Sequence, residues 1–330
     1  MFLLNSNNLQ ELTSYLQQQN WLQNNEVVTN AAKPGEGNMN YVLRINTATR
    51  SFIIKQSRAY VEKYPQVAAP ANRATIEGKF YETIKGNETI KNYSPAILGI
   101  DAVNNIIALE DLGEANDFTF IYTTHQKINA EDIAAFTKYI SHLHNHFYKK
   151  VADFELSNKD MRALNHEHIF IYPFLLDNGF NLDNVQVGLQ DLAIQYKTDN
   201  ALKTKAKEVG EKYLSNGHYL LHGDFYPGSW LKTNNGVKVI DPEFCFYGHA
   251  EFDVAVMIAH LKMTHHSQEL IQQIMDNYLQ PSGFSVSLLN QFIGIEILRR
   301  LLGLAQLPLQ LSLNEKKVLL EEAHQLIINF

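Results

Sequence analysis

The sequence predicts an α+β protein with two lobes. Its 330 residues exceed what a single hydrophobic core usually serves. Strand patterns and a glycine-rich loop are concentrated in the first third of the chain, whereas helical spacing of apolar residues dominates the rest. We therefore expect an N-terminal lobe with an antiparallel sheet over residues 1–112 and a mainly helical C-terminal lobe over residues 113–330, with a cleft between them.

The first lobe is predicted from short apolar runs separated by turn residues. In chain order we expect an amphipathic helix over 8–22, a loop over 33–40, strands over 41–45 and 51–55, a helix over 70–85 and a strand over 106–109. The glycine and acidic residues of Glu110-Asp111-Leu112-Gly113 mark the expected end of this lobe.

The second lobe is predicted from apolar residues at spacings of three and four. Asn129 and Asp132 resemble a capping box, and the apolar spacing that follows predicts a helix with one buried face over 129–147. The same spacing predicts further helices over 202–214, 266–279, 288–302 and 313–328.

Composition excludes several classes of protein. The formal net charge of -7 argues against general binding of nucleic acid, which needs a basic surface. No stretch reaches the roughly 20 apolar residues that span a bilayer. Cys245 is the single cysteine, so it cannot form an intramolecular disulfide, and the amino terminus lacks a basic region followed by an apolar run. We therefore expect a cytoplasmic protein without a membrane or nucleic-acid partner.

Two aspartates carry the strongest chemical signal. Asp224 lies in His222-Gly223-Asp224, after an apolar stretch, and Asp241 ends a second apolar stretch. A turn at Asn234-Asn235-Gly236 separates them, and a hairpin there could bring the two carboxylates together. Phosphoryl transfer uses such an arrangement, because one carboxylate orients the attacking hydroxyl and accepts its proton while others hold magnesium on the phosphates.

The two roles are assigned from position along the chain. We expect Asp224 to be the base, Asp241 to be the main Mg²⁺ ligand and Glu243 to be an auxiliary ligand. In protein kinases a metal-binding Asn follows the catalytic Asp by five residues, and here that position is Ser229. We include Ser229 as a weaker candidate ligand.

Upstream residues fit the binding of ATP. Gly35, Gly37 and Asn40 belong to a loop whose backbone amides could cover phosphates. Lys55 ends the apolar strand that follows, and Glu77 on the next predicted helix is the best candidate partner for its ammonium group. The backbone of Glu110-Asp111-Leu112 could hydrogen-bond to an adenine edge.

Several separate segments resemble the aminoglycoside phosphotransferase and choline kinase superfamily and, within it, the 5-methylthioribose kinase family. The segments span nearly the whole chain. They are Gly37-Asn38-Met39-Asn40-Tyr41-Val42, Ile53-Ile54-Lys55-Gln56, Arg73-Ala74-Thr75-Ile76-Glu77, Glu110-Asp111-Leu112, His222-Gly223-Asp224, the run from Asp241-Pro242-Glu243-Phe244 to Gly248, and Leu298-Arg299-Arg300-Leu301-Leu302-Gly303-Leu304-Ala305.

The resemblance implies a bilobal protein-kinase-like fold and an ATP-dependent sugar kinase of methionine salvage. It implies that Asn38 or Asn40 joins Lys55 and the 110–112 backbone in binding ATP, and that Asp241 with Glu243 holds the metal–nucleotide complex. Asp224 would face the anomeric hydroxyl of the sugar. One or both of Arg299 and Arg300 would complete the sugar site, the product would be a sugar 1-phosphate, and a homodimer is expected.

The sequence departs from that family beside the proposed base. Where the family typically reads Asp-Leu-His-Thr-Gly-Ser, this chain has Asp224-Phe225-Tyr226-Pro227-Gly228-Ser229. Two alternatives therefore stay open. The acceptor could be an aminoglycoside, homoserine or a choline-like alcohol, although Arg299 and Arg300 oppose a cationic acceptor, or the chain could be a nucleotide-binding pseudokinase.

Overall fold

The computed structural model describes residues 2–23, 25–35, 37, 39–151 and 154–330. The chain forms two compact units. Unit 1 comprises Met1–Asn116 and Thr233–Cys245, and unit 2 comprises Asp117–Lys232 and Phe246–Phe330. We expected each lobe to be one continuous stretch of chain, with the boundary at residue 112. Unit 1 instead also includes the later segment Thr233–Cys245. That segment returns because its strand and short helix pack against helical elements of unit 1.

Unit 1 is built on an antiparallel sheet with the strand order β1-β2-β3-β7-β6. Its strands are β1 (Asn30–Ala32), β2 (Tyr41–Asn46), β3 (Ser51–Gln56), β6 (Ile97–Asp101) and β7 (Ile106–Glu110), with a separate β4 (Tyr60–Val61) and β5 (Tyr64–Ala68) ribbon and β11 (Gly236–Val239). Its helices are α1 (Leu9–Gln18), α2 (Arg73–Ile84), and the 3₁₀ turns η1 (Ile90–Tyr93) and η7 (Pro242–Phe244).

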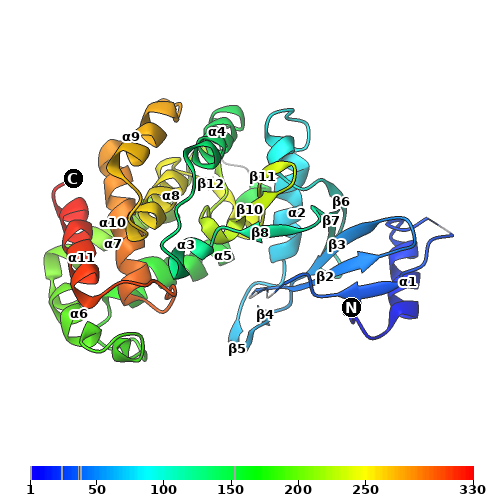
Figure 1. The fold of residues 1–330 in the computed structure, drawn as a ribbon, viewed down its shortest axis with the longest axis horizontal. Coiled ribbons are helices and arrows are strands. Elements are labelled where there is room, and N and C mark those ends of the chain that lie inside the picture. The colour runs from blue at the N-terminus through cyan, green and yellow to red at the C-terminus, as the bar shows by residue number, and fades with distance from the viewer. Residues whose placement is uncertain (1, 24, 36, 38, 152–153) are drawn as a thin grey trace. The chain divides into compact units, whose positions relative to one another are not determined.

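Helices α1 and α2 cover opposite faces of this sheet, as Figure 1 shows. Ile54 points toward α1 and joins the core formed with Leu12 and Leu16. Side chains alternate along a strand, so the next residue, Lys55, points to the other face, the one that α2 covers. Ile107, the register partner of Lys55, lies on that same face. The sheet therefore holds a lysine on a buried surface beside α2.

Unit 2 is mainly helical. Its helices are α3 (Phe120–Thr123), α4 (Ala130–His146), α5 (Lys159–His166), α6 (Leu189–Thr198), α7 (Asn200–Leu214), α8 (Glu251–Met263), α9 (Gln268–Asn277), α10 (Val286–Leu302) and α11 (Leu313–Ile328). Short helical turns lie at η2 (Phe154–Leu156), η3 (Glu167–Ile171), η4 (Tyr172–Phe174), η5 (Leu182–Asn184) and η6 (Pro227–Ser229). Its strands are β9 (Tyr219–Leu221) and β12 (Phe246–Gly248), while β8 (Ala115–Asp117) and β10 (Trp230–Thr233) contain the points where the chain passes from one unit to the other.

The predicted α+β fold, with a sheet in the first part and helices in the second, is confirmed. The buried core of unit 2 centres on α10, which packs against α8 and α11 (Figure 1). Asn129 caps α4 as predicted, because its side chain accepts a hydrogen bond from the backbone N–H of Asp132. Within the described ranges, no helix combines the length and the apolar character that crossing a bilayer requires.

Candidate active site

Lys55 forms the centre of an ion-pair cluster in unit 1. Its Nζ lies 2.7 Å from Glu77 Oε2, and this ion pair joins β3 to α2. Nζ also donates a hydrogen bond to Asp241 Oδ1, on the segment that follows β11. The sequence predicted the pairing of Lys55 with Glu77, and the structure contains it.

Burial and neighbouring charges shift the pKa values of Lys55 and Glu77 in opposite directions. Burial alone would lower the pKa of Lys55, but the carboxylates of Asp241, Glu77 and Glu243 raise the pKa above its ordinary value. Lys55 is therefore a permanent cation. Burial also raises the pKa of the Glu77 carboxyl, and the nearby Lys55 ammonium opposes that rise. A cation held between carboxylates is well placed to take phosphate oxygens as further ligands.

Asp241 stands where β11 ends and the short helix η7 begins. Its backbone has a φ of 63°, in the left-handed region that residues with a Cβ adopt infrequently. Its side chain is 49% exposed, although that of Lys55 beside it is only 6% exposed. Backbone strain of this kind concentrates at functional sites. Asp241 thus presents a carboxylate to solvent from a fixed position.

Glu243 is held by a buried polar network. Its Oε2 accepts a hydrogen bond of 2.8 Å from Asn40 Nδ2 and lies 3.5 Å from Arg73 Nε. Arg73, which is fully buried, also donates to Asn40 Oδ1 at 3.0 Å. The same guanidinium donates to the backbone oxygens of Met39, Arg58, Tyr60 and Pro70. Asn40 therefore connects the glycine-rich loop to Glu243.

The donor set fits a magnesium ion that also binds phosphate. Asp241 and Glu243 supply carboxylate oxygens, the ligands that Mg²⁺ prefers. Among the described residues, no group of three or more His, Cys, Asp or Glu side chains is arranged to hold a metal by itself. Mg²⁺ in nucleotide sites usually takes one or two carboxylates and completes its shell with phosphate oxygens and water. Two carboxylates are therefore sufficient for such a site.

The other residues predicted to bind ATP also lie in unit 1. Gly35 has open space where a Cβ would be placed, and Gly37 lies near Asn40 O. Asn38 falls outside the described residues. The Asp111 carboxylate pairs with Arg44, at 2.8 Å, and accepts from the backbone N–H of Gly113.

Glu110 and Leu112 lie at the end of the same sheet. The backbone N–H of Glu110 donates to Ala96 O, and its carboxylate accepts from Ala96 N. The predicted adenine contacts of the 110–112 segment stay predictions.

Asp224 belongs to unit 2 and lies three residues after the last residue of β9. β9 pairs with β12 in antiparallel register, with Leu221 opposite Phe246. After the strand, Asp253 fixes the turn, because its carboxylate accepts hydrogen bonds from His222 N at 2.7 Å and from Gly223 N at 2.9 Å. Gly223 has a φ of 84°, which favours glycine.

An aromatic core anchors the other side of the loop. The rings of Tyr139 and Phe225 stack at 5.8 Å, and Phe136 stacks on Trp230 at 4.6 Å. These contacts make the loop that carries Asp224 a rigid part of unit 2.

The Asp224 side chain is 22% exposed and lies beside a buried cation. Arg300 Nη2 is 3.8 Å from Asp224 Oδ1. Ser229, which is buried, donates from Oγ to the backbone oxygen of Asp224 at 2.9 Å. In this position the Ser229 hydroxyl stabilises the loop, and its predicted role as a metal ligand stays a prediction.

Arg299 and Arg300 share one carboxylate. Glu296 Oε2 accepts from Arg299 Nη1 at 3.0 Å, and Oε1 accepts from Arg300 Nε at 2.6 Å. Burial would raise the pKa of Glu296, but Arg299 and Arg300 hold the pKa well below its usual range. Glu296 therefore stays ionised and fixes both guanidinium groups. Arg300 is the member of the pair that reaches Asp224.

His260 completes this network as a neutral imidazole. Burial lowers the pKa of His260 to about 4, although the hydrogen bond to Glu296 opposes the shift. His260 Nε2 lies 3.1 Å from Glu296 Oε1, and Nδ1 lies 2.6 Å from Tyr122 Oη. Because an ionised carboxylate only accepts, Nε2 carries the proton, and Nδ1 accepts from the tyrosine hydroxyl.

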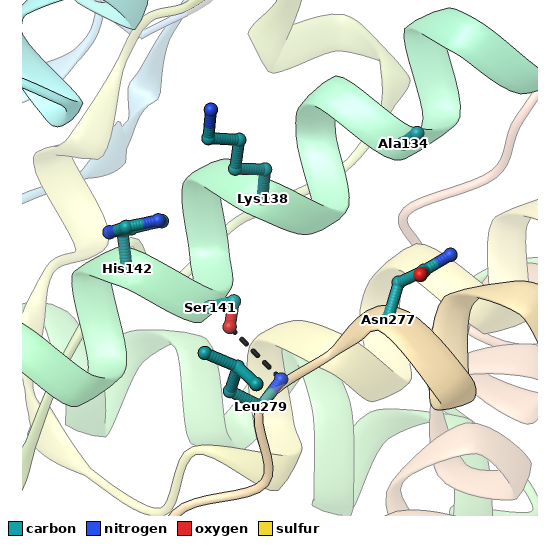
Figure 2. A pocket seen from close by; sticks show the side chains of 6 residues that line it. All are labelled: Ala134, Lys138, Ser141, His142, Asn277 and Leu279. Carbon is teal, nitrogen blue, oxygen red and sulfur yellow. Dashed lines mark hydrogen bonds between the residues drawn. The ribbon is translucent and has the colours of Figure 1, made fainter.

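A separate pocket of about 280 Å³ lies beside α4 in unit 2. Figure 2 shows its lining, in which Ser141 Oγ accepts a hydrogen bond from the backbone N–H of Leu279. Its lining residues are Ala134, Lys138, Ser141, His142, Asn277 and Leu279. None of the residues predicted for the site lines this pocket.

Sequence reasoning missed Arg73, Asp253 and Glu296. Arg73 stood in a segment that carried the family resemblance, but a charged residue at a helix start ordinarily faces solvent. Asp253 accepts hydrogen bonds from backbone N–H groups about 30 residues earlier in the chain, and residue spacing does not indicate such a long-range contact. Glu296 lies one helical turn before the paired arginines, and this i, i+3 and i, i+4 spacing could have indicated it.

Comparison with known proteins agrees with the resemblance seen in the sequence. The model of the Phosphotransferase enzyme family matches residues 186–286. Methylthioribose kinase of Bacillus cereus (strain G9842) is 29% identical over 250 residues, which cover 71% of this chain and 61% of that protein. The enzyme of the same name from Bacillus mycoides (strain KBAB4) is 28% identical over 251 residues. The chain thus spans about three fifths of the length of these relatives, 61% in both cases.

Solved structures match over nearly the whole chain. A choline kinase from Streptococcus pneumoniae has a TM-score of 0.55 at 11% identity, covering 97% of this chain and 98% of its own. A spectinomycin phosphotransferase in complex with ADP and its antibiotic has a TM-score of 0.52 at 14% identity, covering 96% and 97%. The predicted resemblance is confirmed, and the chain has the two-part protein-kinase-like fold of the small-molecule phosphotransferases.

Proposed function

We propose that this protein is an ATP- and Mg²⁺-dependent kinase that phosphorylates a hydroxyl group of a small sugar, methylthioribose or a related ribose derivative. The ion pair between Lys55 on β3 and Glu77 on α2 carries the proposal. In kinases a strand lysine paired with a helix glutamate positions the phosphates of ATP, and both groups must be in place for transfer. The pair also lies beside the exposed carboxylate of Asp241, the proposed Mg²⁺ ligand.

Unit 1 supplies the nucleotide and metal part of the reaction. Lys55 binds phosphate oxygens, and Asp241 with Glu243 holds Mg²⁺. When bound there, Mg²⁺ would supply neutralisation of the charge that develops on the phosphoryl oxygens during transfer. Arg73 and Asn40 keep the Glu243 carboxylate in a fixed orientation. The loop with Gly35 and Gly37 is proposed to cover the phosphates.

Unit 2 supplies the acceptor part. The carboxylate of Asp224 accepts the proton of the acceptor hydroxyl while the hydroxyl oxygen bonds to the γ-phosphorus of ATP. The bond from the γ-phosphorus to the bridging β–γ oxygen breaks, and ADP leaves. Arg300 Nη2 lies 3.8 Å from Asp224 Oδ1, so it places a guanidinium beside the proposed base, where it could also bind an acceptor oxygen.

Charge and the relatives support the proposed acceptor class. Arg299 and Arg300 place two cations in the acceptor part, with Glu296 as their shared partner. This arrangement suits a neutral polyol better than a cationic alcohol. The relatives of similar sequence are named methylthioribose kinases, which favours a ribose derivative as the acceptor. Phosphorylation of its anomeric hydroxyl is what the sequence resemblance implies. A homodimer and a role in methionine salvage are further expectations from the family resemblance.

Release of ADP with a panel of acceptors tests the proposal. Methylthioribose should stimulate ADP release by the native chain in the presence of Mg²⁺, and the phosphorylated sugar should appear in equal amount. Asp224→Ala should lower kcat about 10²- to 10⁴-fold and leave the affinity for ATP nearly unchanged. Asp276→Asn, which changes an exposed aspartate on α9, is the control.

The outcomes separate the alternatives. Faster turnover with choline, homoserine or an aminoglycoside than with any ribose derivative would reassign the acceptor. Magnesium-dependent binding of ATP without turnover of any acceptor would identify a pseudokinase and refute the proposed activity.

A further inference from the structure

Tyr226 stands two residues after the proposed base and is partly exposed. Its backbone N–H donates to Asp224 O at 3.1 Å, so both residues share one tight turn. The guanidinium carbon of Arg300 lies 5.3 Å from the centre of the Tyr226 ring. The His260 ring lies 5.5 Å away at an interplanar angle of 48°. The phenol ring is therefore packed against a cation and a neutral imidazole.

Gly228 leaves the space that this ring occupies. A Cβ on Gly228 would lie 2.4 Å from both Cζ and Oη of Tyr226, a separation that real Cβ atoms do not show. The backbone of Gly228 is outside the left-handed region, so alanine is sterically compatible with the chain itself. The glycine is thus required by the tyrosine ring rather than by the backbone.

The groups packed against the ring are themselves held by buried hydrogen bonds. Glu296 holds Arg300 through the 2.6 Å bond to Nε. His260 is held between Glu296 and Tyr122. A ring supported by fixed neighbours keeps one orientation, which is what a selective binding surface needs.

We propose that Tyr226 is the residue that selects the acceptor, and that it selects an uncharged sugar carrying an apolar substituent over a cationic alcohol. This inference rests on the proposed kinase function. The ring offers an apolar face and a phenolic hydroxyl, a combination that suits a molecule with both hydroxyl groups and an apolar part. The Arg300 guanidinium already lies over the ring, 5.3 Å from its centre, so a cationic acceptor would have to compete with it for the aromatic face.

Steady-state kinetics with methylthioribose, ribose and choline test the inference. Tyr226→Ala should lower kcat/KM for methylthioribose by about tenfold or more and reduce the preference for methylthioribose over ribose. Tyr226→Phe keeps the ring and should stay within about threefold of the native preference. KM for ATP should change less than about twofold in both variants, because unit 1 is untouched.

A double-mutant cycle separates selection by the ring from general damage to the loop. Gly228→Ala should lower the methylthioribose preference in the native background, since the added methyl group displaces the ring. In the Tyr226→Ala background the same substitution should have little further effect. Gly86→Ala, at an exposed glycine with open space around it, is the matched control.

Each outcome has a defined meaning. Loss of preference in Tyr226→Ala and Gly228→Ala, with non-additive effects in the double variant, supports the inference. Unchanged preference in Tyr226→Ala, with folding verified by thermal unfolding, overturns it and leaves the kinase proposal intact. Failure of the native chain to phosphorylate any alcohol overturns both.

Discussion

The Nζ atom of Lys55 lies 2.7 Å from Glu77 Oε2, with the two side chains 6% and 0% exposed. Glu77 would be an uncompensated buried carboxylate without this cation. Removing one partner of a buried ion pair is much more costly than replacing both by apolar groups. The pair therefore couples the stability of unit 1 to the residue that is proposed to bind phosphate.

Lys55→Met should destabilise unit 1 by about 3–5 kcal/mol, because it leaves Glu77 buried without a partner. Lys55→Met combined with Glu77→Leu should recover a large part of that loss, while kinase activity stays absent in both variants. Urea unfolding followed by tryptophan fluorescence measures the free energy of unfolding. Lys207→Met, at an exposed position of α7, is the control and should stay within about 0.5 kcal/mol of the native chain. Equal stability of the native chain and Lys55→Met would contradict the structural role.

The magnesium requirement should differ between the two proposed ligands. Asp241→Asn removes a charge from the exposed carboxylate and should abolish detectable transfer at ordinary Mg²⁺ concentrations. Glu243→Gln keeps the shape of a side chain that Asn40 and Arg73 already hold, so the concentration of Mg²⁺ needed for half-maximal rate should rise about 10- to 100-fold. Titration of the initial rate with Mg²⁺ at fixed ATP distinguishes the two. An unchanged Mg²⁺ dependence in Asp241→Asn would remove it from the metal site.

Much of the fold could be predicted from the sequence, because many elements show one buried face. The helix α11 spans Leu313–Ile328 as predicted, and β3 and α4 were also anticipated. Helix α8 was not predicted, since nearly all its residues are buried and no polar stripe marks its period. The ribbon of β4 and β5 was missed for the opposite reason, because no residue of β5 is buried.

Within the candidate site, the order of residues in the sequence indicated the side chains that are proposed to contact ligands. It did not indicate the side chains that fix those groups in position. Lys55 and Asp241 end apolar strands, and Glu77 falls on the helix predicted after Lys55, which made them recognisable. Arg73 and Asp253 act mainly on backbone groups, whose positions depend on the finished fold. A single sequence carries little information about such contacts.

Stability should depend on pH through His260. Its pKa is about 4 in the folded protein and about 6.5 in an unfolded chain, so the unfolded state binds more protons between these values. The free energy of unfolding should therefore fall as pH decreases from 6.5 to 4, by up to about 3 kcal/mol from this residue.

Comparison of the native chain with His260→Gln isolates this contribution. Urea unfolding between pH 7 and pH 4.5 should show a shallower pH dependence for the variant, because glutamine has no proton to gain. His125→Gln, at an exposed position, is the control and should follow the native curve. Parallel curves for the native chain and His260→Gln would show that His260 does not titrate as its burial requires.

Asp253 should control the position of Asp224 without touching a ligand. Its carboxylate accepts from the backbone N–H groups of His222 and Gly223 and lies 3.2 Å from His144 Nε2. Asparagine at position 253 offers one oxygen, so at least one buried N–H group loses its acceptor, at a cost of about 1–3 kcal/mol. Asp253→Asn should therefore lower stability and reduce kcat more than it raises KM for ATP, whereas Asp276→Asn should change neither. A variant that loses stability but keeps the native kcat would show that the turn before Asp224 is held by other contacts.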